Sequence, residues 1–127
     1  MNKTENEISY LIRGAIFDVY NALGPGLFES VYVAALNYEL EKRGCQVKTG
    51  VSVPVVYDSV NLDVGFRLDL LVDDKVIVEV KSVEELNKVH HKQVITYLRL
   101  TNLKLGILVN FNVDEITKGI IRKVDNL

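Results

Sequence analysis

The stretch from Arg67 to Lys81, RLDLLVDDKVIVEVK, constrains the fold more than any other part of the sequence. Side chains alternate between the two faces of a β-strand, so an apolar residue at every second position marks one buried face. Two such rows flank the polar residues 73–75, which have the composition of a tight turn. The sequence therefore predicts a hairpin with strands from about Asp63 to Val72 and from Val76 to Lys81. The apolar rows are Leu68, Leu70 and Val72 on the first strand and Val76, Val78 and Val80 on the second.

The length of the turn determines how these strands pair. If both apolar rows face one core, the turn must hold an odd number of residues, because an even number would turn one row to the opposite face. Residues 73–75 meet this condition, and the expected pairs on the apolar face are Val72 with Val76, Leu70 with Val78 and Leu68 with Val80. On the other face the same register places Asp69 directly opposite Glu79. Arg67 then lies opposite Lys81.

The expected proximity of Asp69 and Glu79 needs a chemical reason. Directly opposed side chains have Cβ atoms about 5 Å apart, and two carboxylates at that separation repel each other. Lys81, on the same face as Glu79, is one candidate positive partner. A divalent cation is another, because Mg²⁺ prefers carboxylate and carbonyl oxygen. The alternative is a plain charged cluster on a solvated sheet face, which the helices expected before and after the hairpin disfavour.

The other elements follow from hydrophobic periodicity and from residues that end helices. Pro54 lies within a β-branched run and predicts an edge strand or a bulge. The order helix, helix, three strands, helix, strand predicts an α/β fold with a mixed sheet flanked by helices, in one domain covering residues 1–127. The expected helices span Glu5 to Leu23, about Leu27 to Arg43 and Glu84 to Leu100; the other expected strands span residues 51–57 and 105–109, with a turn at 58–61 and a short closing element within 113–124.

Two polar residues on the expected helices attract attention. Glu29 follows the corner Gly24-Pro25-Gly26, and an acidic residue in a first helical turn is stabilised by the helix dipole without any functional role. Gln93 lies one turn before Tyr97, on the side of its helix that Leu86, Val89, Val94 and Leu98 mark as inward. A buried amide needs partners, so Gln93 either bonds to core backbone groups or points with Tyr97 into a polar site beside the hairpin. His90 lies one turn earlier on the same side, and nothing assigns it a metal role.

Composition limits the classes of function. The net charge of −2 and the pI of about 5.7 exclude a broad basic field, so any nucleic-acid contact must be local. The densest basic stretch, Lys88 to Lys92, also fits a solvated helix face. One cysteine and two histidines exclude an internal disulfide and a cysteine-rich zinc site. No secretory signal and no apolar stretch near ~20 residues is present, so we expect a cytoplasmic protein without a membrane span.

The hairpin carries a recognisable signature. Asp69, followed after nine residues by Glu79-Val80-Lys81, resembles the D…(D/E)-x-K signature of the PD-(D/E)XK nuclease superfamily. Leu68 stands where the signature has a proline, a change that the superfamily tolerates widely. The resemblance implies a restriction-endonuclease-like fold.

Further motifs extend the resemblance over almost the whole chain. Gln93-x-x-x-Tyr97 is similar to the Q-x-x-x-Y motif of the RecB-like branch, and Glu29 resembles the upstream helical acid of the superfamily. Gly26-x-x-Glu29-x-x-Tyr32 resembles the motif that names the small bacterial GxxExxY proteins. Each motif alone is weak, but four in the expected order on the expected elements are a specific pattern.

The resemblance implies metal-assisted hydrolysis of phosphodiester bonds in nucleic acid, with DNA as the expected substrate. Lys81 would orient or deprotonate the attacking water and stabilise the charge that develops on the phosphate. Gln93 and Tyr97 would fix Lys81, the water or the scissile strand. The implied ligands of Mg²⁺ or Mn²⁺ are Asp69, Glu79, the Val80 carbonyl and, directly or through water, Glu29.

The sequence also bears on the partners of the protein and on functions other than cleavage. A small acidic chain needs more contact surface for nucleic acid, so we expect a homodimer or a protein partner. The main alternative is a nuclease-like module that binds nucleic acid or a protein without cutting. A third class, a small-molecule enzyme with a P-loop, is unsupported, because the Gly24-Pro25-Gly26 corner lacks the Lys-Ser/Thr that phosphate binding needs. The candidate nucleic-acid contacts are Tyr32, Arg67, Lys88, His90 and Lys92.

Overall fold

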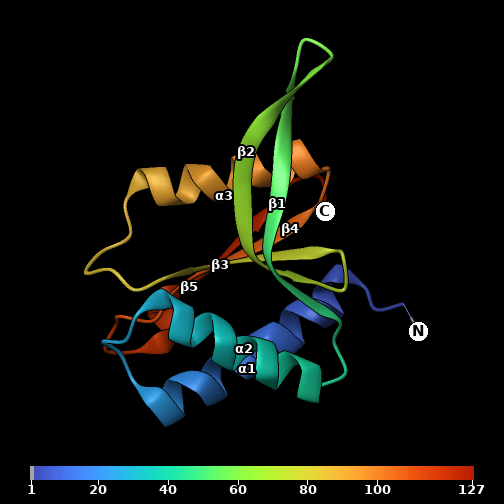
Figure 1. The fold of residues 1–127 in the computed structure, drawn as a ribbon. Helices are drawn as coiled ribbons and strands as arrows, with labels where there is room; N and C mark the ends of the chain where they lie inside the picture. The colour runs from blue at the N-terminus through green and yellow to red at the C-terminus, as the bar shows by residue number, and fades with distance from the viewer. Residues whose placement is uncertain (1) are drawn as a thin grey trace.

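Helices cover both faces of one mixed β-sheet in the computed structural model, which describes residues 2–127 (Figure 1). The elements are α1 (Glu5–Leu23), α2 (Glu29–Lys42), β1 (Val47–Tyr57), β2 (Val60–Val72), β3 (Val76–Lys81), α3 (Lys88–Thr101), β4 (Leu105–Asn110), the 3₁₀ helix η1 (Ile116–Gly119) and β5 (Ile120–Val124). The strand order is β1-β2-β3-β4-β5, with β3 and β4 parallel and the other neighbours antiparallel. α1 and α2 pack on one face and α3 on the other, which confirms the predicted fold class.

α1 occupies the range that its apolar periodicity predicts. Thr4 and Glu7 form a capping box, in which each side chain accepts a hydrogen bond from the backbone N–H of the other. The buried stripe faces α2 and the sheet and consists of Ile8, Ile12, Ala15, Ile16 and Val19. Within residues 2–127 no helix combines the length and hydrophobicity that a membrane span requires.

The start of α3 differs from the prediction. The helix begins at Lys88 and not at Glu84, because the Asn87 side chain accepts hydrogen bonds from the N–H groups of Val89 and His90 and caps it there. Val89 was expected on the inward side but is 70% exposed. Val94 and Leu98 are fully buried, so the inward side begins one turn later than the periodicity indicated.

The β2–β3 hairpin confirms part of the predicted register. Residues 73–75 form the turn, and the strands pair Val72 with Val76 and Leu70 with Val78. Strand pairing ends there, so Leu68 does not pair with Val80. It packs with Ile77 and Leu98 in the smaller cluster under α3, while Leu70 and Val80 belong to the larger cluster under α1 and α2.

β2 pairs with both β1 and β3 over Leu70–Val72, and beyond this point it keeps only β1 as its partner. In the continued pairing with β1, Arg67 lies opposite Ser52, so the expected pairing of Arg67 with Lys81 is wrong. Gly50 on β1 has a φ of 58°, a left-handed conformation that interrupts the alternation of side chains. The two strands therefore leave the core sheet as a two-stranded arm.

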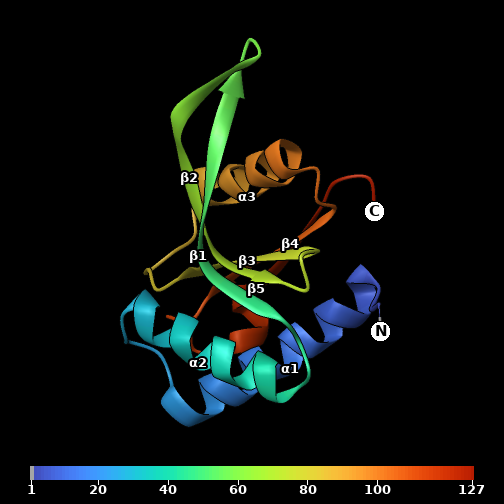
Figure 2. The same cartoon turned by 45° about the vertical axis from the view of Figure 1, so that its right-hand side comes forward.

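The arm formed by the distal halves of β1 and β2 extends past α3 (Figure 2). A register shift between Pro54 and Val56 confirms the bulge that Pro54 predicted, and β1 lies at the sheet edge. The turn is tighter than expected, because Asp58 and Ser59, both with positive φ, connect Tyr57 directly to Val60.

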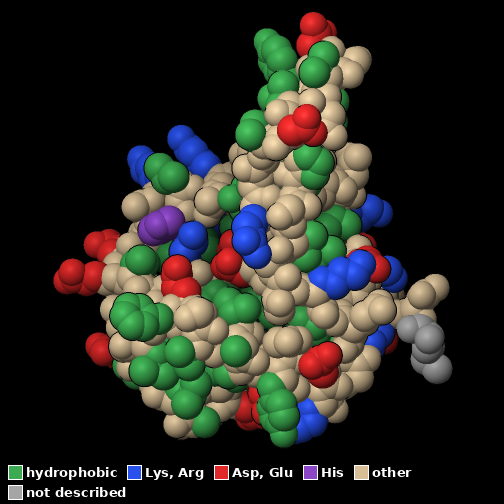
Figure 3. Space-filling view, viewed as in Figure 1, with side chains coloured by type: hydrophobic (Ala, Val, Ile, Leu, Met, Phe, Trp, Pro, Cys, Tyr) green, Lys and Arg blue, Asp and Glu red, His purple; other side chains and the backbone are tan. Residues whose placement is uncertain are grey.

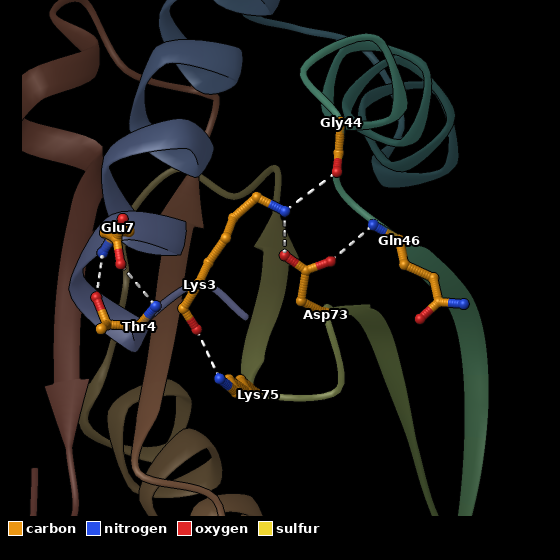
Figure 4. Close-up of polar contacts among 7 residues, drawn as sticks. All are labelled: Lys3, Thr4, Glu7, Gly44, Gln46, Asp73 and Lys75. Atoms are coloured by element: carbon orange, nitrogen blue, oxygen red, sulfur yellow. Dashed lines mark hydrogen bonds and ion pairs between the residues drawn. The ribbon is translucent and has the colours of Figure 1, made fainter. Parts of the chain in front are cut away.

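Polar contacts fasten the N-terminal segment to the β2–β3 turn (Figure 4). Lys3 Nζ lies 2.9 Å from Asp73 Oδ2 and donates to the Gly44 carbonyl at 3.1 Å. Asp73 Oδ1 accepts from the Gln46 N–H at 2.8 Å. Burial raises the pKa of Asp73, but the hydrogen bonds from Gln46 and Lys3 outweigh it and leave the pKa below its ordinary value.

Asp73→Asn is expected to lower the free energy of unfolding by about 1–3 kcal/mol at pH 7, because the charged acceptor of two hydrogen bonds is lost. A lowered folded pKa means that the carboxylate contributes stability above its unfolded pKa and loses it as the pH falls through the folded pKa. The difference from wild type should therefore shrink between pH 5 and pH 2. Urea titrations across this range measure it. Asp74→Asn is the matched control, because Asp74 also has positive φ but pairs with Lys48 at the exposed surface.

Candidate functional site

Asp69 and Glu79 meet where β2 and β3 stop pairing. The Val80 N–H donates to Asp69 Oδ2 at 2.8 Å, and the Asp69 N–H donates to Glu79 Oε1 at 3.3 Å. The two carboxylates thus take the place of the carbonyl acceptors that a continued ladder would supply. This exchange explains why the strands separate after Leu70 and Val78, and it brings the two acids together as the sequence predicted.

Glu79 has an unusual environment for an acid. It is 3% exposed and lies on the central strand β3, opposite Leu108 of β4. Burial raises the pKa of Glu79 to about 8, and the Asp69 carboxylate adds to the increase. The positive charge of Lys81 acts in the opposite direction but does not cancel these effects. The protein therefore holds a carboxyl group that is costly to ionise unless additional positive charge arrives.

The backbone of Val80 is directed toward the same carboxylate. In a strand, the N–H and C=O of one residue point to the same side. Since the Val80 N–H bonds to Asp69, its carbonyl also points toward the β2 side. The next residue, Lys81, points its carbonyl toward β4, where it accepts from the Phe111 N–H. Lys81 shares a face with Glu79, is half-buried and forms no ion pair with the described residues 2–127.

α3 adds Tyr97 and Gln93 beside this pair. Tyr97 stacks on Phe66 of β2, with ring centroids 4.1 Å apart. Burial raises the pKa of Tyr97, and the negative charge of nearby Glu79 raises it further. Gln93 Oε1 is buried without a hydrogen-bond partner among residues 2–127. Of the two interpretations, this orphaned oxygen favours the polar site over an amide satisfied within the core.

Glu29 reaches the site from a different side. It is exposed in the first turn of α2 and lines an open groove of about 530 Å³ together with Asp69 and Arg67. Asn37, whose Oδ1 has no partner among residues 2–127, lines the same groove. In the described part of the chain no three Asp, Glu, His or Cys side chains are grouped closely enough to hold a metal ion. Glu29 is thus near Asp69 along the groove but does not close a three-carboxylate cluster.

The corner before Glu29 is held by Tyr32. Its hydroxyl donates to the Gly24 carbonyl at 2.6 Å and accepts from the Leu27 N–H at 3.1 Å, and its ring stacks on Phe111. Tyr32 is fully buried, so the expected contact between Tyr32 and nucleic acid is wrong. The tyrosine instead positions the start of α2 and, through it, Glu29.

The remaining predicted contacts lie on α3 and β2. Lys88 and Lys92 are exposed on α3, whereas His90 is half-buried and its Nδ1 accepts from the Asn87 N–H. Arg67 donates from Nη2 to the Gly50 carbonyl at 3.1 Å and points along the groove of Asp69. Acidic and basic side chains lie next to one another where the arm meets the helical layer (Figure 3).

Sequence reasoning missed two residues that organise the loop after Lys81. Asn110, at the end of β4, is 2% exposed and exchanges hydrogen bonds with the backbone of Val83. Ser82 Oγ donates to the Leu27 carbonyl at 2.6 Å and joins this loop to the α2 corner. An asparagine ending an otherwise apolar strand was the available sequence signal for Asn110. Together these contacts fix the elements that carry Lys81 and Glu29 relative to each other.

A comparison with protein families shows to which family the chain belongs. The family described as the PD-(D/E)XK nuclease superfamily matches residues 6–123. The chain belongs to this superfamily. Searches of curated proteins and of solved structures give no match. The matched range contains Asp69, Glu79 and Lys81, the residues through which the sequence resembles the superfamily signature.

Proposed function

We propose that this member of the PD-(D/E)XK superfamily is a divalent-metal-dependent nuclease that hydrolyses phosphodiester bonds, with DNA as its substrate. The observation that carries the proposal is the juxtaposition of Asp69 and Glu79 at the point where β2 and β3 separate, with Lys81 on the same face as Glu79. A structural role alone would not favour two acids beside each other in a nearly buried position.

The donor set fits a hard divalent cation. Asp69 and Glu79 supply carboxylate oxygens, Val80 offers a carbonyl on the same side, and Lys81 forms no ion pair in the described chain that would neutralise them. Mg²⁺ and Mn²⁺ select such oxygen ligands and retain water molecules, which leaves a place for Glu29 to act through water. When bound, the ion would supply an activated water and charge stabilisation at the phosphate.

The side chains around the acids have distinct proposed tasks. Lys81 holds or removes a proton at the attacking water and stabilises negative charge on the phosphate. Gln93, whose Oε1 is buried without a partner among residues 2–127, and Tyr97, which stacks on Phe66, would fix Lys81, the water or the scissile strand. Arg67 and Asn37 line the groove that leads to Asp69, where they would contact the strand on either side of the cleaved bond.

The substrate must also be held by a chain with a net charge of −2. Local contacts by Arg67, Lys88, Lys92 and His90 would serve this purpose. We further propose that a homodimer or a protein partner extends the contact surface, since few basic groups surround the acids.

Metal binding is the first test of the proposal. Asp69→Asn and Glu79→Gln keep the shape of each side chain and remove its charge, so both should weaken Mg²⁺ or Mn²⁺ binding at least about 10-fold. Isothermal calorimetry on the two variants and wild type measures the effect. Glu85→Gln, an exposed acid in the loop after β3, is the control for the loss of one charge. Equal affinity in all four proteins would show that the two acids are not ligands.

A further inference from the structure

A second groove lies on the other side of α3, between this helix and β5. It has a volume of about 480 Å³, and its lining contains no acidic residue. Tyr97 and Gln93 face Phe66 and the acids, so the helix separates this groove from the proposed cleavage site. The lining consists of His91, Lys92, Ile95, Thr96, Arg99 and Lys123.

The pairing of β5 with β4 explains why Lys123 lines the same groove as residues of α3, which lie about thirty positions earlier in the chain. Lys123 pairs directly with Gly106 of β4, so the two residues face the same side of the sheet. A Cβ atom added to Gly106 would lie 2.6 Å from Val94 Cγ1, which shows that this side faces α3 and that the glycine allows close packing of the helix. Arg122 points to the opposite side, where it contacts Asn6 of α1.

The positive charge of this groove is not neutralised within the described chain. Lys92, Arg99 and Lys123 form no ion pair with residues 2–127. By contrast, five other basic side chains pair with carboxylates; these are Lys3, Lys42, Arg43, Lys48 and Lys118. Burial lowers the pKa of His91, and the charges of Lys123 and His90 lower it further, as expected where cations gather. In an acidic protein such a concentration of unpaired cations favours an anionic ligand.

The spacing of the cations indicates what kind of anion fits. Lys92 and Arg99 are seven residues apart on one helix, which separates them by about 10 Å along the axis. A single small anion cannot contact both, whereas a polyanion lying along α3 can. Arginine offers a planar fork that suits phosphate oxygens, and Lys123 adds a charge from the facing strand. An extended phosphate chain therefore matches the groove better than an isolated phosphate does.

We propose that the α3–β5 groove binds the phosphodiester backbone of a nucleic acid at a site separate from Asp69 and Glu79. This inference rests on the proposed nuclease function for the identity of the polyanion. The groove holds a flanking part of the substrate, or its second strand, while α3 presents Gln93 and Tyr97 to the cleavage site. Contacts of this kind position the nucleic acid without reading its sequence.

The test compares two triple variants with the same change in charge. The groove variant carries Lys92→Ala, Arg99→Ala and Lys123→Ala, and the control carries Lys42→Ala, Lys48→Ala and Lys118→Ala, which removes only ion-paired lysines. Fluorescence anisotropy with labelled single- and double-stranded DNA is measured in EDTA, so that binding is read without metal or cleavage. Thermal unfolding and Mg²⁺ calorimetry confirm that each variant keeps its fold and its Asp69–Glu79 site.

The groove variant should bind DNA at least 10-fold more weakly than wild type, and the control within about 3-fold. The salt dependence of log K should also fall in slope by about 2, because each lost phosphate contact removes roughly 0.7 on a single strand. If the triple variant unfolds, Arg99→Gln alone, at an exposed position, should still weaken binding about 3-fold. Equal losses in the two triple variants, no binding by wild type, or equally tight binding of poly-glutamate would overturn the inference. Groove-dependent binding without cleavage would count only against the nuclease proposal.

Discussion

Lys81→Ala is expected to lower the rate of DNA cleavage by a factor of at least ~10² while Mg²⁺ affinity and folding stay nearly unchanged. Lys81 is half-buried beside Glu79, has no carboxylate partner in the described chain and is not a metal ligand in the proposed site. Its removal therefore takes away a proton-transfer or charge-stabilising group and leaves the acids in place. Single-turnover cleavage, with calorimetry on the same preparation, measures both quantities.

Two further variants sharpen this prediction. Lys81→Arg keeps the positive charge but cannot give up a proton near neutral pH, so partial retention of activity indicates charge stabilisation and full loss indicates proton transfer. Lys118→Ala removes an exposed lysine in a surface ion pair and should cleave like wild type. If the domain only binds nucleic acid, Lys81→Ala would weaken DNA affinity modestly, and wild type would not cleave with any metal.

Glu79→Gln is expected to stabilise the metal-free protein at pH 8.5. Glu79 has a folded pKa of about 8 against an unfolded value of about 4.5, so the folded state disfavours its ionised form. For an acid with a raised folded pKa, the destabilisation is absent below the unfolded pKa, grows as the pH rises between the two values and is complete above the folded one. The shift corresponds to a penalty of roughly 5 kcal/mol. Glutamine avoids it and keeps an oxygen for the Asp69 N–H.

Thermal unfolding in EDTA at pH 5 and pH 8.5 measures this effect. The variant should unfold on the order of 10 °C higher than wild type at pH 8.5 and show a much smaller difference at pH 5. Saturating Mg²⁺ should reduce or reverse the difference, because it stabilises the protein with intact ligands. Glu85→Gln controls for the loss of one exposed acid. A difference that does not change between the two pH values would contradict the buried, costly carboxylate.

The fold was largely predictable because its signals are local. Alternating apolar residues and an odd turn length gave the register of Val72 with Val76 and Leu70 with Val78. The sequence could not show that the ladder ends there, because that depends on side-chain oxygens of Asp69 and Glu79 replacing carbonyl acceptors. The position of Leu68 under α3 follows from the same end of the β2–β3 pairing.

The candidate site was predictable only in part. The proximity of Asp69 and Glu79 followed from the register. The placement of Glu29 depends on contacts between segments far apart in the sequence, namely the stacking of Tyr32 on Phe111 and the hydrogen bond from Ser82 to the Leu27 carbonyl. Tyr32 gave no sequence signal of complete burial, since tyrosine is common both in cores and at binding surfaces. Lys123 joins Lys92 only through the pairing of β5 with β4, which the predicted order of elements did not include.

The most direct measurement of the central claim is cleavage by wild type and Asp69→Asn prepared identically and incubated with a panel of DNA and RNA substrates in Mg²⁺, Mn²⁺ or EDTA. Asp69 links the two strands and is a proposed ligand, so its amide variant removes the charge while keeping the shape. The nuclease account predicts metal-dependent cleavage by wild type and at least about 10²-fold less by the variant. Equal cleavage by both proteins, or cleavage in EDTA, would show that the activity does not belong to the Asp69–Glu79 site.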